Sequence, residues 1–179
     1  MNYLITIFFF IFLHTVSSGQ DISNKYPGLI QRVAKINQDS SMEKVVMINE
    51  EFMPQMTDGG GELVGYFIKG QIQRITRKIG LSYGIETYDY YFEKGALIFI
   101  YETLDGFLYL DSLNSADYTK TETNFIGRYY FRNKKLIDNE TTGHNRFEND
   151  DLDMEKTLLT EVNECLNKVL RQRNQLNKN

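Results

Sequence analysis

The stretch YDYYFEKGALIFIY, residues 88–101, decides the fold of this 179-residue chain. Aromatic and β-branched residues, which favour strands, lie on both sides of Lys94-Gly95. Glycine readily adopts the positive φ that a tight turn requires, so this pair stands where a hairpin would reverse. The stretch therefore predicts a two-stranded β-hairpin.

Two weaker copies of this pattern occur, GYFIKGQIQRI at residues 65–75 and YYFRNKKLIDN at residues 129–139. Each has a polar pair at its centre, as a turn requires. We expect one antiparallel meander of about six strands, built from hairpins over residues 62–79, 88–101 and 122–142. The connection at residues 104–120 is apolar enough to pack over a sheet edge or to add a short strand.

Helical patterns lie on both sides of the hairpins. Residues 21–37 predict an N-terminal helix. Residues 43–52 fit a helix or a strand, and the capping-box spacing of Ser40 and Glu43 favours a helix. Residues 150–173 predict a long helix, because an apolar stripe runs through them and their acidic start and basic end suit the helix macrodipole. The fold class is therefore α+β, an antiparallel meander with an N-terminal helix or helices and a long C-terminal helix packed on it.

The N-terminus predicts export. Residues 3–13 are almost entirely apolar and are followed by small residues, which is the layout of a signal peptide, and the run is shorter than the about 20 residues of a membrane span. We expect a signal peptide at 1–19, one α+β domain at 20–173 and a frayed tail at 174–179. The mature chain would be periplasmic or extracellular and would have no transmembrane segment.

Composition limits the function classes. The formal net charge is −4, which disfavours nucleic acid as a partner, since Lys and Arg contacts to phosphate drive such binding. The single cysteine, Cys165, excludes an intramolecular disulfide and fits a small buried hydrophobe or an intermolecular pair. After signal cleavage His144 is the sole histidine, so we expect no catalytic set, no metal site and no cofactor.

Two polar segments suggest chemistry and have simpler explanations. Residues 58–62, DGGGE, lack the Gly-Lys-Ser/Thr and the following helix of a phosphate-binding loop. The acids at residues 150–155 lack the central glycine of an EF-hand loop and suit the start of a helix. We interpret the first as a loop and the second as solvated helix-terminal acids.

The predicted register assigns side chains to the two sheet faces. Two-residue turns would pair Phe92 with Leu97, Tyr90 with Phe99 and Tyr88 with Tyr101, on a face covered by helices. The other face is also rich in apolar and aromatic residues, where a wet face should be polar. Either helices cover both faces, or this second face is an exposed patch that binds a partner. The contact residues would then be Tyr66, Tyr91, Ile98 and Tyr130.

Three functions remain open from these observations. The first is an exported, non-catalytic binding or assembly protein that uses the aromatic sheet face, with an unknown protein or envelope component as its partner. The second is a secreted hydrolase that uses carboxylates in the loops, which would require two facing carboxylates of raised pKa. The third is a structural oligomer mediated by the apolar stripe of the last helix, part of which has heptad-like spacing.

Two resemblances accompany these hypotheses. The segments DGGGELVGY at residues 58–66, IGLSYG at residues 79–84 and YYF at residues 90–92 resemble a group of uncharacterised secreted proteins of Bacteroidetes-type bacteria. That resemblance implies export and no particular activity. The repeated element [Gly/Tyr]-Tyr-Phe-x-[Lys/Asn]-[Gly/Lys]-x-[Leu/Ile], which begins at Gly65, Tyr90 and Tyr129, is similar to the hairpin units of MORN-type repeat proteins.

Overall fold

The structure is a computed structural model that describes residues 25–110, 115–144, 146–148 and 151–178. The predicted signal peptide at 1–19 lies outside the described residues, as does the part of the predicted first helix that precedes residue 25.

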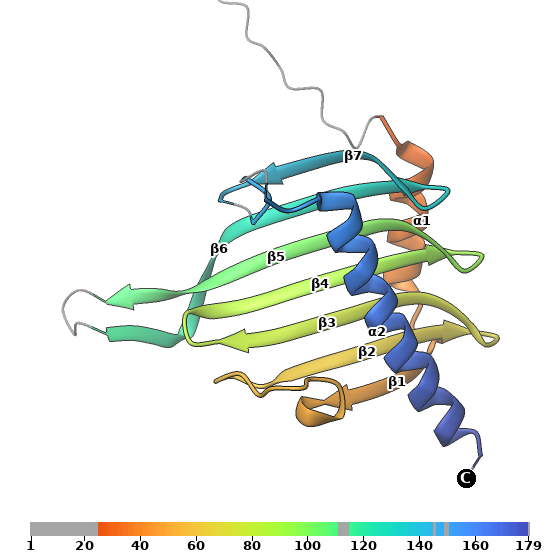
Figure 1. Ribbon diagram of the computed structural model, residues 1–179, viewed down its shortest axis with the longest axis horizontal. Coiled ribbons are helices and arrows are strands. Elements are labelled where there is room, and N and C mark those ends of the chain that lie inside the picture. The colour runs from red at the N-terminus through yellow and green to blue at the C-terminus, as the bar shows by residue number, and fades with distance from the viewer. Residues whose placement is uncertain (1–24, 111–114, 145, 149–150, 179) are drawn as a thin grey trace, which may run out of the picture.

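An antiparallel meander forms the centre of the molecule, in the order β1-β2-β3-β4-β5-β6-β7 (Figure 1). One helix crosses each face of this seven-stranded sheet, so the predicted α+β class is confirmed, with one strand more than expected. The elements are α1 (Pro27–Gln38), β1 (Glu43–Ile48), a 3₁₀ turn (Asn49–Glu51), β2 (Gly61–Ile68), β3 (Gln71–Leu81), β4 (Gly84–Glu93), β5 (Ala96–Leu110), β6 (Ser115–Arg132), β7 (Lys135–Thr142) and α2 (Met154–Leu176).

The additional strand is β1, in the segment for which we favoured a helix. That expectation is wrong. Val45 and Met47 are buried on the face covered by α2, whereas Val46 and Ile48 between and after them are exposed. This period of two is that of a strand, and pairing with β2 along its whole length stabilises it.

Residues 104–120 do not form a separate connection. The two central strands simply continue, so that β5 reaches Leu110 and β6 starts at Ser115. Their ends extend beyond the neighbouring strands as a long arm (Figure 1). Phe107 and Tyr118 pack edge to face across this arm, with ring centroids 5.1 Å apart. The apolar residues that argued against a free loop are therefore strand residues.

All three predicted hairpin turns form, and each is followed by a register shift that the sequence did not predict. Both turn residues have positive φ, for example 50° at Lys94 and 78° at Gly95. Phe92 pairs with Leu97 as expected, but Tyr91 then pairs with Phe99 because one extra residue is inserted in β5. The predicted pairs of Tyr90 with Phe99 and of Tyr88 with Tyr101 are therefore wrong. Equivalent shifts occur in the other two hairpins, between Tyr66 and Phe67 and between Tyr130 and Phe131.

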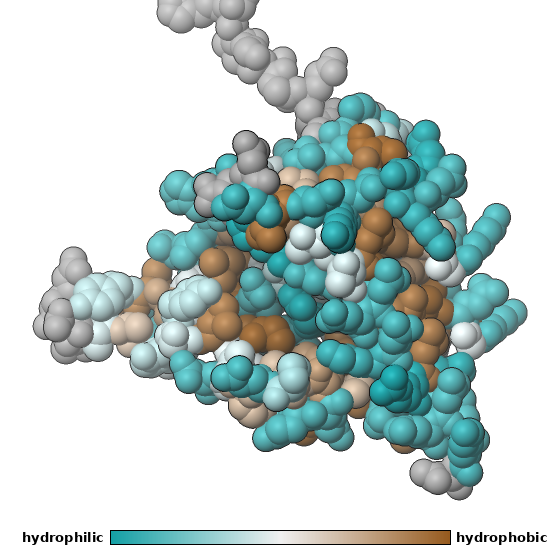
Figure 2. All heavy atoms as spheres, viewed as in Figure 1, coloured by the Kyte–Doolittle hydropathy of each residue, from teal (hydrophilic) through white to brown (hydrophobic). Residues whose placement is uncertain are grey.

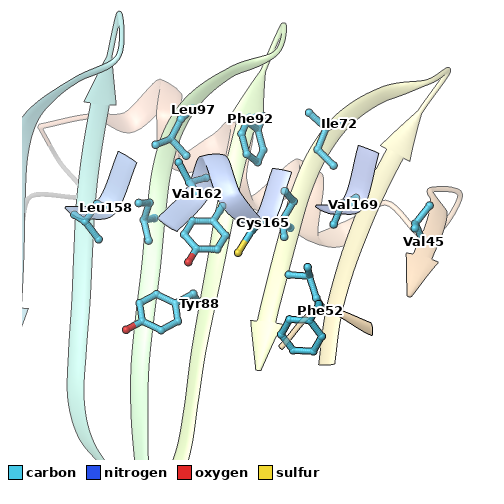
Figure 3. Close-up of a cluster of buried hydrophobic side chains, with 14 of the residues drawn as sticks. Val45, Phe52, Ile72, Tyr88, Phe92, Leu97, Leu158, Val162, Cys165 and Val169 are labelled. Atoms are coloured by element: carbon cyan, nitrogen blue, oxygen red, sulfur yellow. The ribbon is translucent and has the colours of Figure 1, made fainter. Parts of the chain in front are cut away.

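The main core lies between the sheet and α2 (Figure 3). The helix starts where Asp153 accepts a hydrogen bond from the Lys156 amide, 2.9 Å away, and it continues past residue 174 to Leu176. Its outward side is hydrophilic, and hydrophobic side chains are visible on both sides of it (Figure 2). Its buried residues are Leu158, Val162, Cys165 and Val169. Most of the apolar stripe that suggested an oligomer is thus packed within the chain, whereas Leu152 and Leu170 at its two ends are exposed.

Candidate binding pocket beside helix α1

An aromatic row crosses the sheet beneath α1. Tyr91, Phe99 and Tyr130 occupy neighbouring positions on β4, β5 and β6, where the register places each opposite the next. Their ring centroids lie 5.8 Å apart for Tyr91 and Phe99 and 5.1 Å apart for Phe99 and Tyr130. Tyr26, just before α1, covers the end of the row, 5.0 Å from Tyr130. The row and the buried Ile36 of α1 form a second, smaller core.

The four sequence-predicted contact residues lie on this face, in two different environments. Tyr91 is 3% exposed and Tyr130 is 1% exposed, because α1 covers them. Tyr66 and Ile98 are partly buried at the sides of the same cluster. Both faces of the sheet therefore carry a helix. Partner binding through these four side chains stays a prediction, and contact with Tyr91 or Tyr130 would require α1 to move.

A pocket of about 470 Å³ lies beside α1 on this face. One side is formed by α1, and the rest by the four strands from β4 to β7. Its volume is within the range of small-molecule sites, and aromatic and aliphatic side chains predominate in it, as in most such sites. The lining residues are Ile30, Val33, Asn37, Tyr91, Phe99, Tyr101, Arg128, Tyr130 and Glu140.

Two charged groups stand in the pocket. The Arg128 Nη1 atom lies 3.8 Å from the Glu140 Oε2 atom, and the two side chains are 33% and 38% exposed. The Arg128 guanidinium also lies 5.5 Å from the centroid of the Tyr101 ring. A contact at 3.8 Å is an ion pair without a hydrogen bond, and such exposed pairs contribute little to stability.

Asn37 links α1 to the sheet at the same pocket. Its Oδ1 atom accepts hydrogen bonds from the Arg74 Nη1 atom, 2.8 Å away, and from the Tyr91 hydroxyl, 3.0 Å away. Burial raises the pKa of Tyr91, so this hydroxyl keeps its proton and donates. The α1 wall of the pocket is thereby held in position by polar contacts as well as by packing.

Sequence reasoning missed Tyr101 and Arg128. The predicted register placed Tyr101 on the opposite face, and the inserted residue in β5 moves both Phe99 and Tyr101 to the α1 side. The same shift follows all three turns, but it is visible only in the strand pairing, and no residue of the sequence signals it.

A second polar cluster lies on the other face, beneath α2. Glu102 is 4% exposed and accepts hydrogen bonds from the hydroxyls of Tyr88, at 2.7 Å, and Tyr129, at 2.9 Å. The Arg146 Nε atom lies 3.9 Å from Glu102 Oε1, and its Nη2 atom donates to Glu161 of α2 at 2.7 Å. Burial raises the pKa of Glu102, although the two tyrosines and Arg146 oppose the shift.

Glu102 and Asp89, the two carboxyls whose pKa is raised, do not form the facing pair that the hydrolase hypothesis requires. Burial also raises the pKa of Asp89, which accepts a hydrogen bond from Thr76 and lies 4.0 Å from the Arg74 Nε atom. Asp89 is therefore on the α1 face, whereas Glu102 is on the α2 face. The sheet separates the two, so they cannot act together on one bond.

The other polar candidates are occupied by structural contacts. The His144 Nδ1 atom lies 3.2 Å from Glu148, on the surface. In the loop at residues 58–62, the Gly59 amide donates to the Gly80 carbonyl and the Gly61 amide to Asn49, which leaves them no donor for a phosphate. Within the described ranges, no group of three His, Cys, Asp or Glu side chains could hold a metal ion.

The pKa of Glu102 gives a testable pH dependence. Because the folded state holds this proton more tightly than the unfolded chain, stability falls as the pH rises from the ordinary value of 4.5 through the raised pKa. In Glu102→Gln this loss is absent. We expect the free energy of unfolding of the variant to increase relative to the parent over that window, as measured by urea denaturation from pH 4.5 to pH 8. A difference that stays constant with pH would contradict the shift.

Neither helix of the described chain is both long enough and apolar enough to cross a membrane. Comparisons of the chain with protein-family models, with curated proteins and with solved structures find no significant match. The two resemblances noted in the sequence therefore stay untested.

Proposed function

We propose that this chain is an exported, non-catalytic binding protein that holds its ligand or part of its partner in the pocket beside α1. The observation that carries the proposal is the combination of a 470 Å³ pocket with an aromatic floor and a charged pair at its side. Tyr101 and Arg128 replace Tyr91 and Tyr130 as the main contact residues, because the latter are covered.

The pocket suits binding better than chemistry. Among its lining residues the titratable side chains are Glu140, Arg128 and three tyrosines, and burial raises the pKa of Tyr91 away from neutrality. General acid–base catalysis works best with a group whose pKa is close to the working pH. Aromatic side chains with a few directed polar groups are typical of ligand recognition.

Native mass spectrometry of the mature protein, incubated with an extract of its own cell envelope, tests this function. We expect the protein to retain a bound species that Tyr101→Ala loses, because this ring lines the pocket. Tyr83→Ala is the matched control, since Tyr83 is 62% exposed and lies outside the pocket. Retention by Tyr101→Ala, or no retained species at all, would contradict the proposal.

Export is tested separately. The apolar run at residues 3–13 and the small residues that follow it support cleavage before Gly19 or Gln20. We expect N-terminal sequencing of the protein from its native cells to begin at one of these residues. An N-terminus at Met1 in the mature protein would overturn this part of the proposal.

A further inference from the structure

The arginine in the pocket beside α1 has no committed acceptor. Among the described residues, no side chain or carbonyl accepts a hydrogen bond from Arg128, and its nearest anion is Glu140, with 3.8 Å between Nη1 and Oε2. The other arginines of this face are engaged: Arg32 donates to Gln73 and Arg74 donates to Asn37. A guanidinium has five N–H groups in a rigid planar fork, so Arg128 presents several free donors to the pocket.

Asn37 and Tyr101 add further donors. Because Arg74 can only donate, the Asn37 atom that faces it must be the amide oxygen, and this oxygen already accepts from Tyr91 as well. The uncommitted part of Asn37 is therefore its NH₂ group. The Tyr101 hydroxyl has no partner in the described chain. The free polar groups of the pocket are thus donors apart from the Glu140 carboxylate, which lies on one side of Arg128, so the ligand should supply acceptors to the N–H groups that Arg128 does not direct at Glu140.

The pocket also has an apolar part. Ile30 and Val33 of α1 form one wall and the Tyr101 ring lies on the sheet side, whereas Tyr91, Phe99 and Tyr130 lie beneath them with little exposed surface. Such a lining favours burial of an aliphatic or aromatic body. A ligand that satisfies both regions has an apolar body and an anionic, planar head.

We propose that the pocket binds an amphipathic carboxylate, with the carboxylate at Arg128 and the apolar body against Tyr101, Ile30 and Val33. This inference rests on the proposed function, because it names the ligand class of the same pocket. Arginine pairs with a carboxylate through two parallel hydrogen bonds, and such charge-assisted bonds are the strong ones. The Arg128 guanidinium can donate two hydrogen bonds to the ligand from one edge of its plane, while Glu140 stays near the Nη1 atom.

An ammonium ligand fits less well. Aromatic rings attract cations through their faces, but Tyr91, Phe99 and Tyr130 are buried at 3%, 4% and 1% exposure, so their faces are not free. The ring that remains, Tyr101, already has the Arg128 guanidinium at 5.5 Å. A second cation there would be repelled by Arg128, and Glu140, the carboxylate that would attract it, already has the Arg128 guanidinium beside it at 3.8 Å.

The test is an NMR titration of the ¹⁵N-labelled mature protein with octanoate, octylamine and octanol. The three probes share one apolar body and differ only in the head group. We expect all shifts to fall on amide resonances of pocket residues, and we expect octanoate to bind with the highest affinity of the three. Arg128→Gln should weaken octanoate binding by about tenfold to a hundredfold, the usual effect of losing hydrogen bonds to a charged group. Arg171→Gln is the matched control, since Arg171 is exposed on α2, which covers the opposite face.

A second pair of probes separates two sources of this chemistry. A peptide that ends in Leu-Phe with a free carboxylate is compared with the same peptide amidated. Tighter binding of the free peptide than of octanoate points to a chain terminus, and the reverse points to a small aliphatic acid. Weaker binding of the amidated peptide than of the free peptide supports the carboxylate, and equal binding of the two overturns it for the peptide.

Three outcomes overturn the ligand class: octylamine binds as tightly as octanoate, Arg128→Gln binds octanoate like the parent, or no acid shifts the pocket resonances. The two proposals fail separately. If Tyr101-dependent retention from the envelope extract is seen but no acid binds, only the ligand class is wrong. If the acids bind and no species is retained from the extract, the pocket chemistry holds and the binding function is wrong.

Discussion

Gly65→Ala lowers the free energy of unfolding by about 1–3 kcal/mol, the usual cost of adding a methyl group to a packed core. Gly65 is buried on β2 directly beneath α2, and a Cβ atom there would lie 2.1 Å from Val169 Cγ1. Val169 is fully buried at the last buried position of α2, and the new Cβ would also lie 3.1 Å from Phe67 Cε2, so the packing between α2 and the sheet must rearrange to relieve the clash. Urea denaturation of the parent and the variant measures the effect.

A double-mutant cycle identifies the cause. Val169→Ala removes the atom that meets the new Cβ, so Gly65→Ala should cost at least about 1 kcal/mol less in that background than in the parent. Gly28→Ala is the matched control, since nothing lies within 4 Å of a Cβ at that position in the first turn of α1. It should leave stability unchanged or increase it by up to about 1 kcal/mol, because alanine favours a helix over glycine. Additive costs in the cycle would show that the clash is not with Val169.

Glu102→Leu has an effect of similar or greater size, a loss of about 2–4 kcal/mol. The substitution leaves the hydroxyls of Tyr88 and Tyr129 without their acceptor in a buried site, and each orphaned group costs about 1–3 kcal/mol. Part of this cost is offset, because a buried carboxylate is itself unfavourable. Glu122→Leu, an exposed acid on β6, is the control and should change stability by less than about 0.5 kcal/mol.

The same network predicts a rescue. When Tyr88→Phe and Tyr129→Phe are combined with Glu102→Leu, no hydroxyl of these side chains is left to satisfy, and an apolar cluster replaces the polar one. We expect the triple variant to recover at least half of the stability that Glu102→Leu loses, as measured by urea denaturation. If the triple variant is less stable than Glu102→Leu alone, the tyrosine hydroxyls are not the source of the cost.

The candidate site shows the limit of register reasoning. Pairing strands outward from a two-residue turn is correct at Phe92 and Leu97 and wrong from Tyr91 onward, because β5 contains one extra residue. A one-residue shift moves every later side chain to the other face. Tyr101 was therefore placed on the α2 face, although it lines the pocket beside α1. Tyr91 was assigned to the correct face, and the structure decides between the two alternatives for that face, because α1 buries Tyr91.

By itself the sequence determined the elements that local chemistry specifies. The turn at Lys94-Gly95 needs residues that accept positive φ, and the last helix has its own cap and apolar stripe. These signals come from residues a few positions apart and act before any tertiary contact forms.

Only the tertiary structure decided the rest. Residues 43–48 are a strand because the edge of β2 is available for pairing, and Glu102 is tolerated in the core because Tyr88 and Tyr129 meet it from neighbouring strands. The pocket forms because α1 covers Tyr91 and Tyr130 but only borders Tyr101 and Arg128. Each of these outcomes depends on residues far apart in the chain, whose energies appear only when the sheet and both helices are assembled.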